Sequence, residues 1–246
     1  MFLMTDIYDD DQFFQKYSEM NRSKLGLAGA GEWPTLQQLL PDFRGLSVLD
    51  LGCGYGWHCR YAAEHGAKSV VGVDLSEKML TVARDQTTAT NVTYLKADIA
   101  TVSFPENQFD VVISSLAFHY LPSFAQVTAA VHGYLKPQGR FIFSVEHPVF
   151  TAEGHQDWVY DAAGKISYFP VDRYFDEGQR LANFLDTPVT KYHRTLTTYF
   201  EDLVSHGFTV DHLQEPQPPQ NMLDQPGMKD ELRRPMMLIM AATNQK

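Results

Sequence analysis

Short hydrophobic runs alternate with helical stretches between Leu46 and Val145, a pattern that predicts successive β-α-β units around a parallel sheet. The runs are almost continuously apolar, as expected for strands that helices cover on both faces. The predicted strands are Ser47–Leu51, Ser69–Asp74, Val92–Lys96, Phe109–Ser114 and Arg140–Val145. The pattern therefore predicts an α/β fold.

Helical patterns fill the gaps between these strands, at Trp57–His65, Glu77–Gln86 and Phe124–Leu135. Ser76 is a predicted N-cap for the second helix, because its hydroxyl can accept from the first free backbone N–H groups. The run Lys136-Pro137-Gln138-Gly139 is a predicted stop for the third helix.

The C-terminal part adds an amphipathic helix and two strands. Apolar residues recur at helical spacing from Thr195 to Gly207, and the glycine stands where a C-terminal cap belongs. Phe208–Val210 and Met236–Ala242 are predicted strands that complete a seven-stranded sheet. The proline-rich stretch from Glu215 to Pro226 is predicted to be irregular.

We expect one domain over residues 1–246. Residues 46–145 form its cofactor-binding core, and residues 193–246 supply the last helix and strand pair. Residues 1–41 are helical in tendency, and residues 146–192 form an insert after the fifth strand. Ligands of open α/β sheets bind beyond the carboxyl ends of the strands, so both segments are predicted to be lids over a site.

Composition and charge limit the classes of ligand and partner that we expect. The formal net charge is −10 and the pI is near 5.3, which argues against a nucleic-acid substrate. The two cysteines, Cys53 and Cys59, suggest neither a disulfide framework nor a zinc site. Apolar runs are too short for a membrane span. We therefore expect a cytoplasmic protein, a monomer or homodimer, without a metal.

The decisive motif runs from Val48 to Gly56, where a strand leads directly into a glycine-rich turn. Gly52 and Gly54 allow unusual backbone angles and let a ligand lie against the main chain. Asp74 ends the next strand, 22 residues after Gly52. A carboxylate there can accept hydrogen bonds from both ribose hydroxyls, so the pair implies a nucleoside ligand.

The turn, with Asp74, resembles the first two motifs of class I S-adenosylmethionine-dependent methyltransferases, in the group with a type 11 methyltransferase domain. A dinucleotide fingerprint would need another glycine where Trp57 stands. Three later features follow in that family's order: Ala97-Asp98-Ile99, Phe109-Asp110-Val111-Val112 and Leu135-Lys136-Pro137-Gln138-Gly139-Arg140. The resemblance implies a Rossmann-like three-layer sandwich, with a mostly parallel seven-stranded sheet and an antiparallel C-terminal strand.

The resemblance also implies how S-adenosylmethionine would be held. Gly52 and Gly54 would lie under its methionine part, and Asp50 would help to hold its amino group. Asp74 would bind the ribose. The remaining predicted contacts are Met79 on the adenine, Asp98 and the Ile99 backbone at the adenine amino group, Ser115 at the methionine end, Cys53 and Leu75 beside the motifs, and Tyr17 with Arg22 from the N-terminal lid.

Methyl transfer is an in-line displacement, so the protein mainly aligns the acceptor and excludes water. The candidate catalytic residues are His119, Tyr120 and His147, with Glu146 beside them, because all follow predicted strands at the sheet edge. His119 is equally consistent with a packed or capping residue. His147 precedes Pro148 and is also consistent with a turn.

The acceptor is expected to be a small molecule. After the fourth strand, Ser114-Ser115-Leu116-Ala117 stands in place of the Pro-Pro-aromatic tetrad of base-amino methyltransferases. Tyr192, His193 and Arg194 can reach a polar substrate or simply begin a solvated helix. Aromatic residues of the insert suit an acceptor pocket or the insert's own small core; they are Phe150, Trp158, Tyr160, Tyr168, Phe169, Tyr174 and Phe175.

Two other functions remain open from the sequence. An NAD-dependent oxidoreductase shares the fold and the acidic residue after the second strand. A non-catalytic protein that binds S-adenosylmethionine would keep the same motifs.

Overall fold

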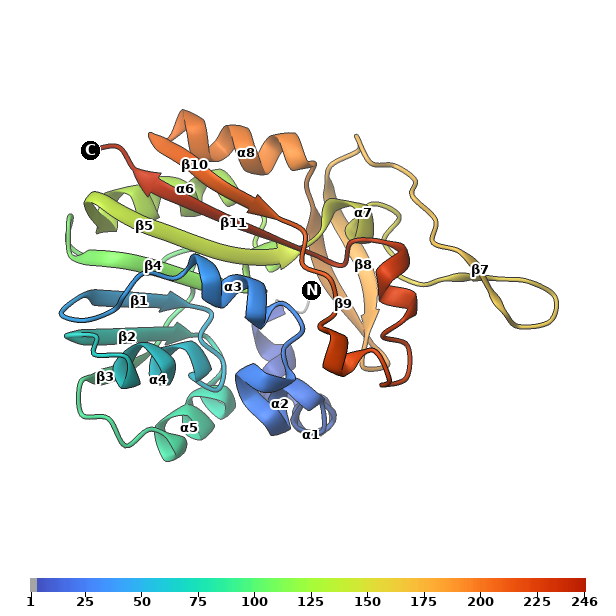
Figure 1. The fold of residues 1–246 in the computed structure, drawn as a ribbon, viewed down its shortest axis with the longest axis horizontal. Coiled ribbons are helices and arrows are strands. Elements are labelled where there is room, and N and C mark those ends of the chain that lie inside the picture. The colour runs from blue at the N-terminus through green and yellow to red at the C-terminus, as the bar shows by residue number, and fades with distance from the viewer. Residues whose placement is uncertain (1–3) are drawn as a thin grey trace.

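A computed structural model describes residues 4–246 of the chain (Figure 1). Its centre is a seven-stranded sheet in the order β10-β11-β5-β4-β1-β2-β3. The strands are β1 Ser47–Leu51, β2 Ser69–Asp74, β3 Val92–Lys96, β4 Phe109–Ser115, β5 Leu135–Glu146, β10 Phe208–Gln214 and β11 Met237–Asn244. All neighbours run parallel except at β11, which is antiparallel to both β5 and β10. The predicted fold class is confirmed.

Strand β5 is longer than its apolar run predicts. It begins at Leu135, directly after the helix, and pairs Leu135 with Phe109 before the register shifts and Arg140 pairs with Val111. The predicted helix stop therefore ends the helix at Tyr134 but also forms an irregular start to the strand. At its other end, Glu146 of β5 pairs with Met237 of β11.

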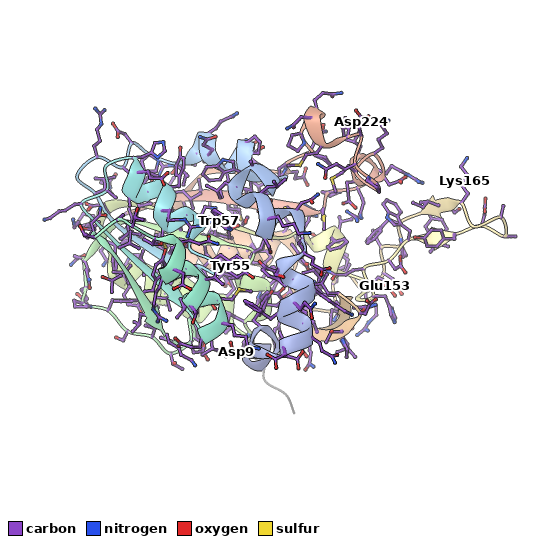
Figure 2. All side chains as sticks on the ribbon, turned by 90° about the horizontal axis from the view of Figure 1, so that it is seen from below. Asp9, Tyr55, Trp57, Glu153, Lys165 and Asp224 are labelled. Atoms are coloured by element: carbon purple, nitrogen blue, oxygen red, sulfur yellow. The ribbon has the colours of Figure 1, made fainter. Side chains whose placement is uncertain are left out.

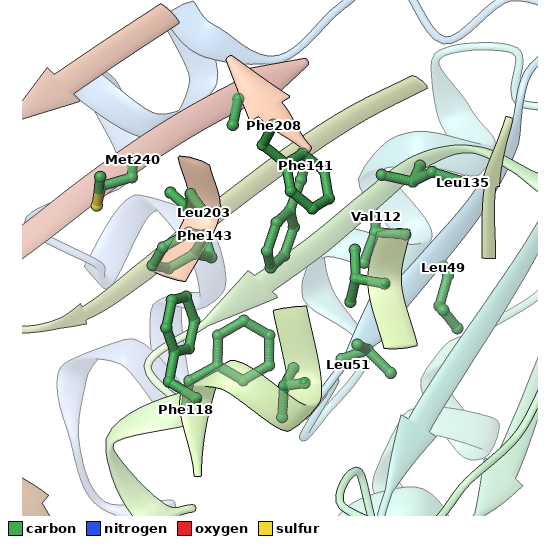
Figure 3. Packing of buried hydrophobic residues seen from close by; sticks show 14 of the residues in the cluster. Leu49, Leu51, Val112, Phe118, Leu135, Phe141, Phe143, Leu203, Phe208 and Met240 are labelled. Atoms are coloured by element: carbon green, nitrogen blue, oxygen red, sulfur yellow. The ribbon is translucent and has the colours of Figure 1, made fainter. Parts of the chain in front are cut away.

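Helices cover both faces of the sheet because successive strand residues point to opposite sides. Val112 and Phe143 face a core formed with α6 Phe124–Tyr134 and α8 Leu196–Ser205 (Figure 3). Their neighbours Val111 and Ile142 face the second core, with α3 Trp33–Leu39, α4 Trp57–Glu64 and α5 Glu77–Gln86. As predicted, Ser76 caps α5 by accepting from the Met79 backbone N–H.

The N-terminal segment is helical as expected, with η1 Met4–Asp9, α1 Asp11–Ser18, α2 Asn21–Leu25 and η2 Gly26–Gly29 before α3. Asp9 fastens it to the sheet domain, since its carboxylate accepts from the Ser76 hydroxyl at 2.5 Å and the Lys78 backbone N–H at 3.1 Å. Trp33 and Leu36 of α3 are buried in the core, so this part of the segment is a fixed layer.

The insert contains the short helix α7 Pro148–Thr151 and two hairpins, β6 Val159–Tyr160 with β7 Ile166–Tyr168 and β8 Gly178–Phe184 with β9 Thr187–His193. The first hairpin projects from the body, with Lys165 near its tip (Figure 2). The second lies against α1, where Lys16 donates to the Leu185 carbonyl at 3.1 Å.

Residues 215–236 connect β10 to β11, and we call them the strap. The strap contains only two short 3-10 turns, η4 Gln220–Met222 and η5 Asp230–Arg233, in agreement with the predicted irregularity. Arg234 anchors it to the insert, because its guanidinium lies 4.4 Å from the Phe150 ring centroid and 4.6 Å from that of Phe169. Within residues 4–246, none of the helices has the length and apolar character that crossing a bilayer requires.

Candidate active site

A cavity of about 510 Å³ opens at the carboxyl ends of the parallel strands. Its floor is formed by residues after β1, β2, β3, β4 and β5, which is where open α/β sheets bind ligands. The N-terminal segment, Phe184 of the second insert hairpin and the strap enclose it from above. One continuous space thus runs from the glycine-rich turn to the strap.

The glycine turn presents bare backbone to this cavity. Gly54 has a φ of +51°, and a Cβ built on it would meet no heavy atom within 4 Å. Gly52 has a φ of +78°, and a Cβ there would lie 2.4 Å from the Cβ of Ala117. Gly54 therefore leaves room for a ligand, whereas Gly52 is required because a side chain there would collide with Ala117.

Asp74 lies beside Gly54 at the end of β2. Its carboxylate accepts from the Gly54 backbone N–H at 2.8 Å and from the Ser76 backbone N–H at 3.0 Å. Burial raises the pKa of Asp74 above its ordinary value, while these backbone N–H groups oppose the rise. A carboxylate has about four acceptor positions, so this one is fixed in place and retains acceptor capacity for ribose hydroxyls.

Leu75, Met79, Asp98 and Ile99, which the sequence predicts to contact the cofactor, all line the cavity. Met79 is buried, and its position on the first turn of α5 brings it beside Asp74. The Asp98 carboxylate accepts from the Ala100 backbone N–H at 2.8 Å, so it shapes a turn as well as lining the cavity. A role of Asp98 in the turn is compatible with its predicted contact to the adenine amino group, which stays a prediction.

Asp50 and Cys53 do not line the cavity, unlike the other predicted cofactor contacts. Asp50 points into the core, where the Cys59 thiol donates to one carboxylate oxygen at 3.3 Å and the other oxygen has no partner among the described residues. Burial raises the pKa of Asp50 to about 7. Cys53 is packed in the core with α3 and α4. Both side chains therefore pack in the core and not in the cavity.

The N-terminal segment places Tyr17 and Arg22 on the cavity wall, as expected, and adds a residue that the sequence analysis missed. Glu32 is 2% exposed, forms an ion pair with Arg22, and accepts from the Ser115 hydroxyl at 3.4 Å. A glutamate before a short helix carries no sequence signal for this position. Only the packing of α3 against the sheet brings Glu32 to the end of β4.

His119 and Tyr120 lie together on the cavity wall, in the turn η3 Phe118–Tyr120. The Tyr120 hydroxyl is 3.1 Å from that of Tyr8. Nδ1 of His119 accepts from the Glu146 backbone N–H at 3.2 Å. Burial lowers the pKa of His119 to about 4, against the opposing effect of the Glu146 carboxylate. This histidine is therefore neutral at physiological pH.

His147 is separated from this group and does not line the cavity. It is the N-cap of α7, where Nδ1 accepts from the Val149 backbone N–H at 3.0 Å, and its Nε2 lies 2.8 Å from the Glu215 carboxylate. The geometry agrees with the turn-forming interpretation. His193 and Arg194 are likewise buried in contacts to the protein, with Thr151 and with the carbonyl of Leu121.

The strap also lines the cavity, although the sequence analysis did not assign it to the site. It contributes Pro216, Gln217, Pro218, Met222, Gln225, Met228, Glu231 and Met236. The insert aromatics Phe150, Trp158 and Phe169 instead pack on one another and on Arg234. They form the insert's own cluster, the second of the two uses considered above.

Comparison with known proteins decides the family. A solved S-adenosylmethionine-dependent methyltransferase from Mesorhizobium loti is 44% identical and superposes with a TM-score of 0.83, covering 89% of this chain and 100% of that one. A candidate S-adenosylmethionine-dependent methyltransferase from Listeria monocytogenes is 52% identical, with a TM-score of 0.86 over 90% of this chain and 100% of that one. The chain belongs to the class I S-adenosylmethionine-dependent methyltransferases.

The methyltransferase therefore uses S-adenosylmethionine, and the oxidoreductase and non-catalytic alternatives are set aside. The methyltransferase-domain family model matches residues 49–143, the part that contains the glycine turn, Asp74 and Asp98. A malonyl-[acyl-carrier protein] O-methyltransferase of Pectobacterium atrosepticum is 30% identical over 145 residues, 59% of this chain and 53% of that enzyme. The family match stops before the strap, so it includes the glycine turn but not the strap.

Proposed function

We propose that this methyltransferase transfers a methyl group from S-adenosylmethionine to a small molecule bound between the His119–Tyr120 turn and the strap. The observation that carries the proposal is one continuous, partly covered cavity whose lining includes both Gly54 with Asp74 and Met236 of the strap. A cavity closed over by three chain segments suits a small acceptor better than a folded protein or a duplex.

The residues at the cofactor end fit S-adenosylmethionine. Gly54 leaves the backbone accessible, Asp74 offers acceptors for the ribose, and Met79 with Ile99 gives apolar contacts for the adenine. Tyr17 and Arg22 close this end from the N-terminal segment. When bound, the cofactor supplies an electrophilic methyl group on a sulfonium, so the chain needs to orient the acceptor and exclude water.

At the acceptor end, the strap and the N-terminal segment exclude water. They are joined by a hydrogen bond of 2.9 Å from the Asn21 amide to Gln225. His119 and Tyr120 are the polar groups positioned to contact the acceptor. The Glu146 carboxylate accepts hydrogen bonds from Lys191 and from Gln156, each at 2.6 Å. These bonds fix the orientation of the carboxylate. Orientation, more than proton removal, is the role these residues support.

Two measurements test the proposal. Calorimetric titration with S-adenosylmethionine, S-adenosylhomocysteine and NAD should show binding of the first two only. Incubation of a cell extract with the enzyme and methyl-labelled S-adenosylmethionine should then place the label in the fraction below about 3 kDa. Label that accumulates in protein or nucleic acid would contradict a small-molecule acceptor. The Asp74→Ala variant is the control for enzyme-dependent labelling.

A further inference from the structure

We infer that the acceptor of this methyltransferase is an uncharged, largely apolar molecule that receives a hydrogen bond from His119; the inference rests on the proposed function. The observation behind this inference concerns the charged side chains on the acceptor half of the cavity. Within the described residues, each of them is paired with an oppositely charged residue of the chain.

Glu146 is the first charged residue of this wall, and its backbone N–H donates to His119. Its two carboxylate oxygens accept from Lys191 and Gln156, and the Lys191 ammonium also donates to the Gln156 side-chain oxygen at 2.8 Å. Lys191 is 2% exposed. The negative charge of Glu146 is thus balanced by Lys191, and the buried ammonium group is not exposed to a ligand.

Glu231 of the strap is neutralised in the same manner. Two nitrogens of the Arg234 guanidinium donate to its two oxygens, at 2.7 and 3.1 Å. The flat faces of that guanidinium are taken up by the aromatic rings of the insert. This arginine therefore cannot turn toward an anionic acceptor without losing both sets of contacts.

Arg22 and Glu32 form the third pair, on the wall of the N-terminal segment. They lie beside Ser115 at the end of β4, where the cofactor's methionine end is predicted to bind. Any ionic contact that this pair makes serves the zwitterionic methionine part of the cofactor better than a separate acceptor.

Apart from the neutral polar side chains of Tyr120, Gln217 and Gln225, the remaining surface is apolar and adaptable. Met222, Met228, Met236 and Met237 line it together with Phe184 and Leu121. Methionine side chains are flexible and polarizable, so they fit irregular apolar ligands. A charged acceptor buried against them would lose its hydration without gaining a counter-ion, which is strongly unfavourable.

His119 supplies a directional hydrogen bond to the acceptor. Because Nδ1 accepts from the Glu146 backbone N–H, the neutral ring carries its proton on Nε2. The ring is therefore a donor toward the cavity, suited to an oxygen or nitrogen lone pair of the acceptor. It is not arranged to remove a proton from it.

The test compares three probes of equal ring size on enzyme saturated with S-adenosylhomocysteine: 2-naphthol, 2-naphthoate and (2-naphthyl)methylammonium, titrated at pH 7. The neutral probe should bind at least tenfold more tightly than either charged probe. Any other order, including no discrimination or no binding, overturns the inference. Failure of S-adenosylhomocysteine itself to bind would instead refute the proposed function.

Variants with an unpaired cation provide the converse test. Glu146→Gln releases Lys191, and Glu231→Gln releases Arg234, each leaving a positive charge at the acceptor wall. Both variants should gain affinity for 2-naphthoate by about tenfold relative to 2-naphthol, and His119→Ala should weaken 2-naphthol binding. Unchanged 2-naphthoate affinity in both glutamine variants, with S-adenosylhomocysteine binding retained, would contradict the inference.

Discussion

The backbone N–H of Glu146 donates to Nδ1 of His119, which links the end of β5 to the turn after β4. This bond fixes the tautomer of the neutral imidazole, with its proton on Nε2. Burial keeps the ring neutral by lowering its pKa to about 4.

Nitrogen-15 NMR of labelled histidines should accordingly show His119 as a neutral Nε2–H tautomer from pH 5.5 to 8. Because the unfolded ring protonates near pH 6.5, this residue should also reduce the stability of the fold as the pH falls from 6.5 toward 4. The exposed His155 is an internal reference, since the Glu153 carboxylate raises its pKa. Titration of His119 near pH 6.5 would contradict the assigned geometry.

Asp74→Ala should weaken S-adenosylmethionine binding by ~1.5–3 kcal/mol, the usual contribution of hydrogen bonds to a charged group. In calorimetry this corresponds to roughly a 10- to 150-fold rise in Kd. Asp85→Ala is the matched control, because Asp85 is an exposed carboxylate on α5. Equal affinity in the two variants would remove Asp74 from ribose binding.

Gly54→Ala should impair cofactor binding more than folding. Its φ of +51° costs a non-glycine residue ~1–2 kcal/mol, and the new methyl group would project where no protein atom lies within 4 Å. Gly164→Ala is the control, since Gly164 has a φ of +75°, equally open surroundings and a place in the projecting hairpin. Both variants should lower Tm similarly, but only Gly54→Ala should lose affinity for S-adenosylhomocysteine. Retained affinity in Gly54→Ala would show that no ligand lies against this turn.

Asp50→Asn should stabilise the fold at high pH. The folded carboxyl has a pKa of about 7 against an ordinary 3.8, so between these values the folded state holds a proton that the unfolded state has released. Stability contributed by this group is therefore lost as the pH rises through 7. Urea denaturation should show a gain for the variant of at most ~4 kcal/mol at pH 8. A difference that does not change between pH 5 and 8 would contradict this account.

Arg234→Ala should loosen the strap while leaving the cofactor end intact. The substitution removes two hydrogen bonds to Glu231 and the contacts with three aromatic rings. Hydrogen exchange of residues 215–236 should accelerate by tenfold or more, which corresponds to ~1.4 kcal/mol of local stability. Lys229→Ala is the control, because Lys229 is an exposed strap residue that pairs with Asp224 of the same segment at 3.7 Å. No change in strap exchange would show that the strap is held by other contacts.

Local sequence signals account for most of the fold. The apolar runs predict β1, β2 and β3 with their observed bounds. Strands β1 and β2 are largely buried, as expected for strands covered on both faces, whereas β3 is an edge strand without a buried residue. The last two strands extend beyond their predicted ends, since polar residues such as His212 and Asn244 pair there with a neighbouring strand. Backbone pairing, rather than side-chain hydrophobicity, determines those ends.

The predicted cofactor contacts that line the cavity could also be found from sequence. Gly54, Asp74 and Met79 follow strand ends, and those ends define the edge of the sheet. Glu32 and the strap methionines were missed for a physical reason. They reach the cavity through tertiary packing, from segments without strand or helix periodicity. Asp50 illustrates the reverse case, since proximity in sequence to the glycine turn does not place its side chain in the cavity.

The pairing of Met237 with Glu146 has an evolutionary consequence. This register joins the acceptor wall to the central sheet, and a slip of one residue would turn each side chain of β11 to the opposite face. The strap itself is under no such constraint, since lengthening a surface connection costs little free energy. Insertions and deletions there would reshape the cavity wall while leaving the sheet unchanged, so under the proposed function we expect strap length to be a determinant of acceptor choice.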